Sequence, residues 1–131
     1  MDEAGTMKAW AGARIAVLSP TPTHPLDFGN RKRIYRICRR YVEEGARLTF
    51  IHYPAELEWR EQIPFRAQRT IQETWAESFT IAPTRRVHED PAGTYHSIDE
   101  WWDSAIGDFL TWLFAVESFD VFIVNYSWLS K

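Results

Sequence analysis

The chain has 131 residues, of which 45% are hydrophobic and 25% charged, the balance of one ordinary globular domain. Its formal net charge of −3 at pH 7 gives no reason to expect nucleic acid as a partner. The single cysteine, Cys38, excludes an internal disulfide and a cysteine-based metal site and favours a cytoplasmic location, and no apolar run approaches the roughly 20 residues of a transmembrane helix.

Residues 1–13 carry two acids and one lysine but no apolar stretch of the kind found in signal peptides. We therefore expect a disordered leader over 1–13, followed by one domain over 14–131.

A βαβ unit is predicted at the start of this domain. The continuous apolar run over 14–19 is typical of a parallel strand covered on both faces, and Pro20 ends it. From Asn30 the apolar residues recur at helical spacing, and Gly45 is suited to end that helix. The predicted stripe consists of Ile34, Ile37, Cys38, Tyr41 and Val42. A second strand is expected over 47–53, so strand, helix and strand follow within 40 residues.

The remaining elements are predicted with less regular signals. We expect a helix over about 64–77, a short strand over 79–82 and an exposed loop over 84–96. Ser97 and Glu100 have the spacing of a capping box that would open a helix reaching Val116. A buried strand is expected over 120–125. The sequence thus predicts an α/β, Rossmann-like three-layer sandwich with a short, mostly parallel sheet.

The last predicted strand is followed by only six residues, too few for the crossover helix that a parallel strand normally feeds. We therefore expect the sheet to be incomplete at its C-terminal end, as in a truncated domain or one that a partner covers.

The segment from Ser19 to Arg33 is the strongest candidate site. In open α/β sheets ligands bind beyond the carboxyl ends of the strands, where helix N-termini attract anions. The helix start at Gly29, Asn30 and Arg31 supplies free N–H groups and a cation. The alternative for Arg33, Arg36, Arg39 and Arg40 is a solvated helix face. A glycine-rich loop that binds the phosphates of a dinucleotide or of ATP needs several glycines. Only Gly29 is present here, so neither kind of loop is expected.

Other chemistry-bearing residues give weaker predictions. His24, with Asp27 nearby, could act as a base or donor in this loop, and Asn125 and Tyr126 follow the last strand at the same edge of the sheet. His52 is expected to be a core or edge residue. His88 and His96 lack metal-ligand spacing, so no metal is expected. The acids at the predicted helix start, Asp99, Glu100 and Asp103, are expected to serve the helix dipole.

Four segments in order resemble the amino-terminal domain of group 1 glycosyltransferases of the GT-B fold. They are RIAVLSPTP (14–22), PLDFGNRKRI (25–34), IDEWWD (98–103) and FDVFIVNYSWLS (119–130). Enzymes of this family have two Rossmann-like domains across a cleft. The amino-terminal domain chiefly holds the acceptor, and its first glycine loop lies beside the donor.

The resemblance implies roles for specific residues. Gly29, Asn30 and Arg31 would contact the phosphates and sugar of a nucleotide-diphosphate sugar, with Asn30 in place of the commoner second glycine. His24, Asp27, Asn125 and Tyr126 would face a glycan or lipid-linked acceptor, and His24 is the one catalytic candidate. No cofactor is implied. The carboxy-terminal, donor-binding domain is missing from these residues, so they are expected to be inactive alone.

Two other functions stay open. The chain could be a stand-alone Rossmann-like or flavodoxin-like binding or interaction module whose exposed sheet edge is covered by self-association into a homo-oligomer. A small-molecule hydrolase or phosphatase is the least favoured, because no nucleophile elbow or paired acid motif is present.

Overall fold

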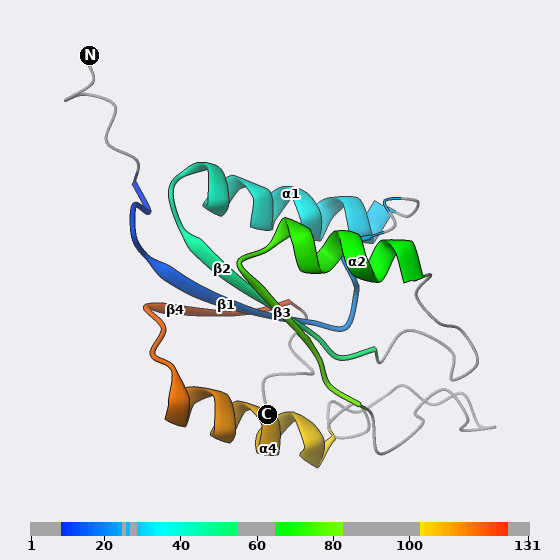
Figure 1. Cartoon of the computed structure of the whole chain (residues 1–131), viewed down its shortest axis with the longest axis vertical. Coiled ribbons are helices and arrows are strands. Elements are labelled where there is room, and N and C mark those ends of the chain that lie inside the picture. Colours follow the sequence, from blue (N-terminus) through cyan, green and yellow to red (C-terminus); the bar gives the residue numbers. More distant parts are fainter. Residues whose placement is uncertain (1–8, 25, 27–28, 55–64, 83–102, 126–131) are drawn as a thin grey trace.

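The described residues of the computed structural model, 9–24, 26, 29–54, 65–82 and 103–125, form a parallel sheet between two helical layers (Figure 1). The strands are β1 (Arg14–Ser19), β2 (Arg47–His52), β3 (Glu77–Thr80) and β4 (Val121–Val124), in the order β3-β2-β1-β4. The helices are α1 (Gly29–Glu43), α2 (Phe65–Thr74) and α4 (Ser104–Val116). Helices α1 and α2 cover one face and α4 covers the other. This confirms the predicted α/β, Rossmann-like sandwich, and every strand pair in the described part is parallel.

The apolar residues of β1 divide between two cores because successive side chains point to opposite faces of the sheet. Ile15 and Val17 pack beneath α1 and α2, together with Phe50 and Trp75. Ala16 and Leu18 pack on the other face against residues of α4 and β2. Because both faces of β1 are covered, nearly every position of the strand is apolar, which explains the continuous apolar run in the sequence.

The predicted stripe of α1 is only partly buried. Ile34 and Cys38 are fully enclosed, whereas Ile37 is 36% exposed. Gly45 ends the helix with φ of +100°, a conformation that glycine adopts without steric cost. The backbone N–H of Gly45 donates to the carbonyl of Val42, as expected of a helix end.

Residues 9–13, which belong to the predicted leader, form a turn against the α1–β2 connection. The backbone N–H of Trp10 donates to the carbonyl of Glu44, and that of Gly12 donates to the carbonyl of Gly45. The Trp10 ring packs edge-on against Tyr41 with centroids 5.2 Å apart. Residues 1–8 lie outside the described part of the chain.

Predicted boundaries of α2, β3 and α4 differ from the structure. Helix α2 ends at Thr74, before the predicted 77, because Glu77 belongs to β3. Strand β3 begins at Glu77, two residues before the predicted 79–82, because its pairing with Thr49–His52 decides its position. Helix α4 begins at Ser104, and its first turn is capped by Asp103, whose side chain accepts from the N–H of Ala105 at 2.9 Å. The predicted capping box at Ser97 and Glu100 and the loop over 84–96 lie outside the described residues.

Candidate functional site

The carboxyl ends of β1 and β4 lie at a reversal of the strand order. After β1 the chain continues through α1 to β2, which pairs with one edge of β1. Strand β4 pairs with the other edge of β1, and the helix before it, α4, lies on the opposite face of the sheet from α1. In open α/β sheets the connections diverge to opposite faces at such a point, and the crevice expected outside the strand ends is where their ligands bind. Backbone bonds continue past the strands here, since the N–H of Asn125 donates to the carbonyl of Leu18 at 2.8 Å.

A buried polar network occupies this point. The Asn125 Nδ2 group donates to Ser19 Oγ at 3.0 Å, and Ser19 Oγ donates to the carbonyl of Thr21 at 2.7 Å. The Arg33 guanidinium donates to Asn125 Oδ1 at 2.9 Å. Both sides of the Asn125 carboxamide are therefore engaged, and its orientation follows from its partners. The network joins the end of β1, the end of β4 and the first turns of α1.

The prediction for Arg33 was incomplete. Its side chain is on the exposed side of α1, as a solvated face requires, but its guanidinium reaches the end of β4. Nothing in the local sequence marks this contact, because Asn125 is 92 positions away.

The loop after β1 folds inward around His24. Thr23 is buried and His24 is 9% exposed. Trp75 Nε1 donates to Thr23 Oγ1 at 3.1 Å, and Thr23 Oγ1 lies 3.0 Å from His24 Nδ1. Because an indole N–H only donates, Thr23 Oγ1 accepts from it and keeps its own proton available for His24 Nδ1.

His24 is further held by an edge-on contact with Tyr35, at a centroid distance of 5.3 Å. Burial lowers the pKa of His24, so the imidazole is neutral at pH 7. A neutral imidazole that is fixed through Nδ1 presents Nε2 as its remaining polar atom. Nε2 is a donor when Nδ1 accepts from the Thr23 hydroxyl, and it is a proton acceptor in the other tautomer, in which Nδ1–H donates to Thr23 Oγ1.

The predicted anion-binding residues lie at the start of α1. Asn30 Oδ1 accepts from the N–H of Arg31 at 2.9 Å, so the asparagine occupies one of the donors that a helix start offers. Gly29 is exposed, and a side chain added there would meet no atom within 4 Å. Neither a close contact nor a positive φ therefore requires glycine at this position.

Among the predicted site residues, the structure places His24 against Tyr35 and Asn125 against Arg33, both in the first half of α1. Asp27 and Tyr126 lie outside the described residues, as do His88, His96, Asp99 and Glu100. Asp103, which is described, lies at a helix start, as expected for that acid cluster, and its side chain caps α4. In the described ranges no three histidine, cysteine or acidic side chains are grouped so as to hold a metal ion. Within the same ranges no helix has the length and apolar character needed to span a bilayer.

The sheet order and the parallel pairing of its strands define a Rossmann-like α/β fold. No protein-family model, curated protein or solved structure that we compared with the chain matches it.

Proposed function

We propose that the chain is the amino-terminal, acceptor-side domain of a group 1 GT-B glycosyltransferase acting in the cytoplasm. The observation that carries the proposal is the bond between Arg33 and Asn125, because it joins the helix that follows the first loop to the end of β4. Two of the four segments that resemble the family, 25–34 and 119–130, thereby form one edge. His24 belongs to the loop at that edge.

The start of α1 supplies what a diphosphate leaving group needs. Helix N-termini stabilise anions by about 0.3–1 kcal/mol, and basic side chains add to this when charge develops. Arg31 and Lys32 are the first cations of α1. In the proposed reaction the helix start, with Gly29 and Asn30, faces the donor phosphates. A second Rossmann-like domain binds most of the nucleotide-sugar.

The acceptor is assigned to the other half of the crevice. His24 and Asn125 would hold an acceptor hydroxyl of a glycan or lipid-linked sugar, with Asp27 and Tyr126 as the further candidates from the sequence. In the tautomer whose Nδ1–H donates to Thr23 Oγ1, a neutral His24 can accept a proton from that hydroxyl at Nε2, which is the one catalytic role we propose.

The test is a titration of the ¹⁵N-labelled chain with UDP-glucose and GDP-mannose, followed by amide chemical shifts. We expect millimolar binding with shifts confined to residues 19–33 and Asn125, and the Asn125→Leu variant should lose them. Replacing Thr70 on the outer side of α2 by Val is the matched control and should keep them. Tight binding, or shifts that map away from this edge, would contradict the proposal.

The second candidate function is self-association, and the apolar surface around β4 favours it. Phe122 is 38% exposed and Phe114 is 44% exposed, and their rings pack edge-on with centroids 5.2 Å apart. β4 is the outer strand on this side of the described sheet. Light scattering after size-exclusion chromatography distinguishes the candidates. A dimer that Phe122→Lys converts to a monomer supports association, and a monomer at all concentrations excludes it.

A further inference from the structure

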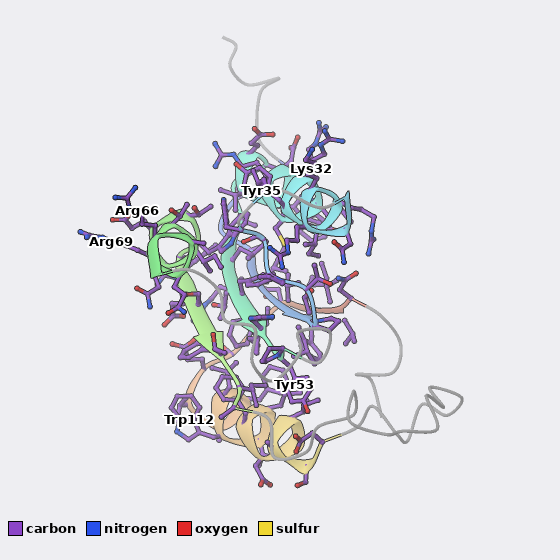
Figure 2. All side chains as sticks on the ribbon, turned by 90° about the vertical axis from the view of Figure 1, so that its right-hand side faces the viewer. Lys32, Tyr35, Tyr53, Arg66, Arg69 and Trp112 are labelled. Carbon is purple, nitrogen blue, oxygen red and sulfur yellow. The ribbon has the colours of Figure 1, made fainter. Side chains whose placement is uncertain are left out.

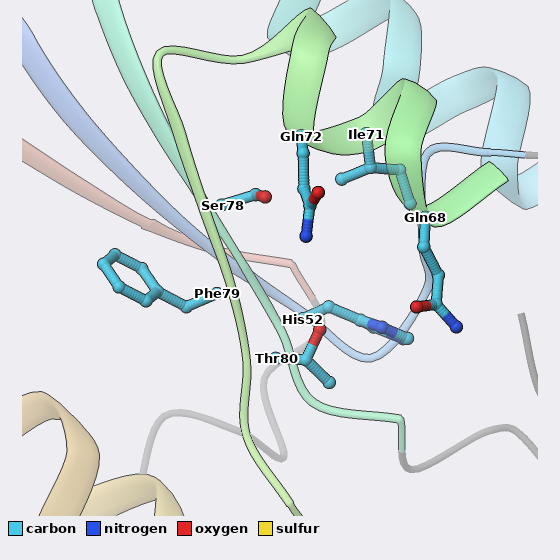
Figure 3. Close-up of a pocket in the computed structure, with 7 residues that line it drawn as sticks. All are labelled: His52, Gln68, Ile71, Gln72, Ser78, Phe79 and Thr80. Carbon is cyan, nitrogen blue, oxygen red and sulfur yellow. The ribbon is translucent and has the colours of Figure 1, made fainter. Parts of the chain in front are cut away.

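A pocket of about 230 Å³ lies between α2 and the carboxyl ends of β2 and β3, two strands away from the end of β4 (Figure 3). It lies on the α1 and α2 side of the sheet. The lining residues are His52, Gln68, Ile71, Gln72, Ser78, Phe79 and Thr80. The Phe79 ring points away from the other six, so this residue contributes backbone rather than its ring.

His52 forms the buried end of this pocket. The residue is 2% exposed, and neither ring nitrogen has a hydrogen-bond partner among the described groups. The Pro20 carbonyl lies near enough to oppose the pKa shift of the ring but does not meet hydrogen-bond geometry. A buried polar group without a partner costs about 1–3 kcal/mol, so its presence calls for an explanation. In Figure 3 the side chains of Gln68 and Gln72 point toward this ring.

Sheet geometry explains why the polar groups converge. His52 is aligned with Thr80, and Phe50 with Ser78, in the parallel pairing of β2 and β3. Residues in register share a face of the sheet, so Ser78 and Thr80 lie on the same side as His52. Gln68 and Gln72 are four residues apart on α2 and therefore project from one side of that helix.

The lining selects a chemical class. None of the described lining residues carries a charge, and the one cation that acts on His52, Arg31, does not line the pocket, which favours an uncharged ligand. Carboxamides, hydroxyls and a neutral imidazole all combine donors with acceptors, which an apolar ligand would leave unsatisfied. The volume is below the roughly 300–1,000 Å³ of typical pockets for drug-sized ligands, so one ring is the upper size.

We propose that this pocket binds a small uncharged polyhydroxylated ring, of monosaccharide or cyclitol size, through His52, Gln68, Gln72, Ser78 and Thr80. The side chain of Ile71 gives the ring an apolar wall. The side chains of Gln68 and Gln72 are exposed, so their carboxamides are accessible to a ligand, and in the proposed complex its hydroxyls supply partners for the ring nitrogens of His52. His52 pairs with Ser19, so this pocket adjoins the end of β1, but none of its lining residues belongs to the site at β1 and β4 and the proposal does not depend on the function proposed there.

The test uses D-glucose and myo-inositol as probes with the ¹⁵N-labelled chain. We expect saturable shifts of the side-chain NH₂ groups of Gln68 and Gln72 and of the backbone amides of Ser78 and Thr80. D-glucuronate keeps the ring of glucose but adds a carboxylate, and we expect it to bind more weakly. No saturable shift, shifts located elsewhere, or equal binding of D-glucuronate overturns the proposal.

Variants at exposed positions keep the test independent of folding. Gln72→Met and Thr80→Val remove polar atoms with little change in shape, and each should weaken probe binding about three- to tenfold, the value of one hydrogen bond. Thr70→Val is the matched control, because Thr70 is exposed on α2 but does not line the pocket. Unchanged binding in both Gln72→Met and Thr80→Val, or an equal loss in Thr70→Val, overturns the proposal.

Discussion

The guanidinium of Arg33 donates a hydrogen bond of 2.9 Å to the side-chain carbonyl of Asn125, which lies 92 positions later in the chain. On its other side the Asn125 amide donates to Ser19 Oγ at 3.0 Å. One carboxamide thus connects the helix that follows β1 with the ends of both strands at the candidate site.

Replacing Asn125 by Leu is expected to lower the free energy of unfolding by about 1–3 kcal/mol, because the buried Ser19 hydroxyl loses a donor. Urea unfolding measures the change. Arg33→Met should cost less, since Arg33 is exposed, and the double variant should cost less than the sum of both. Strict additivity would contradict a direct interaction between the two side chains.

A second buried contact fixes α4 to the sheet. Tyr53 Oη donates to Asp103 Oδ2 at 2.7 Å, and Asp103 also caps α4 (Figure 2 places Tyr53 on the α4 side of the sheet). We expect Tyr53→Phe to cost about 1–3 kcal/mol, because the buried carboxyl group loses its Tyr53 donor. Tyr41→Phe is the control, and a half-buried ring of this kind should change stability by less than about 0.5 kcal/mol. Thermal or urea unfolding compares them, and equal effects would contradict this role of Tyr53.

The stability of the fold should depend on pH through His52. Burial lowers the pKa of His52 from 6.5 to about 4, assisted by the charge of Arg31 and opposed by the Pro20 carbonyl. Between these values the unfolded chain binds a proton that the folded chain excludes. The free energy of unfolding therefore falls as the pH falls from about 6.5 to about 4, by at most about 3 kcal/mol, and is retained above that window.

The variant His52→Leu is expected to remove most of this dependence while leaving stability at pH 7 equal or higher. Urea unfolding at a series of pH values is the measurement. The pKa of His24 is also lowered by burial, so a smaller part of the slope should persist. His24→Gln is the control that should keep the larger part, and a slope unaffected by His52→Leu would show that other groups cause it.

Gly45 and Gly12 offer a matched pair of substitutions. Both have positive φ, +100° and +76° respectively, so alanine is strained at either position. At Gly45 an added Cβ would lie 2.8 Å from the Ala11 Cα, whereas at Gly12 it would meet nothing within 4 Å. We expect Gly12→Ala to cost about 1 kcal/mol and Gly45→Ala clearly more. If urea unfolding gave equal losses in the free energy of unfolding for both variants, residues 9–13 would have to move away from the added Cβ with no loss of stability.

Much of the fold could be predicted because its signals are local. The apolar run over 14–19 and the helix ending at Gly45 were sufficient for the βαβ unit. Strand β3 was misplaced because Glu77 and Ser78 are polar, and only pairing with β2 makes them strand residues. Asp103 was counted among the acids of a helix start, and its bond to Tyr53 depends on a strand 50 positions earlier.

The candidate site was predicted in outline and missed in detail for the same reason. The loop after β1 and the end of β4 could be identified from the rule for parallel sheets. The bond of Trp75 to Thr23 and the surroundings of His52 could not, because their partners come from separate elements. Charge on α1 and α2 was also ambiguous. Figure 2 shows Arg66 and Arg69 projecting outward from α2, away from the sheet, so charge alone does not indicate a site.

The pairing of β1 with β4 also has a kinetic consequence. Ser19 and Asn125 are 106 positions apart, so bringing them together closes a far longer loop than the connection between β1 and β2. Contacts that close long loops form later in folding, because the chain loses conformational entropy on closing the loop before the contacts stabilise it. The order of assembly therefore begins with β1, α1 and β2 and finishes with β4. A chain stalled before that last step holds the first loop and its histidine but lacks the crevice beside them.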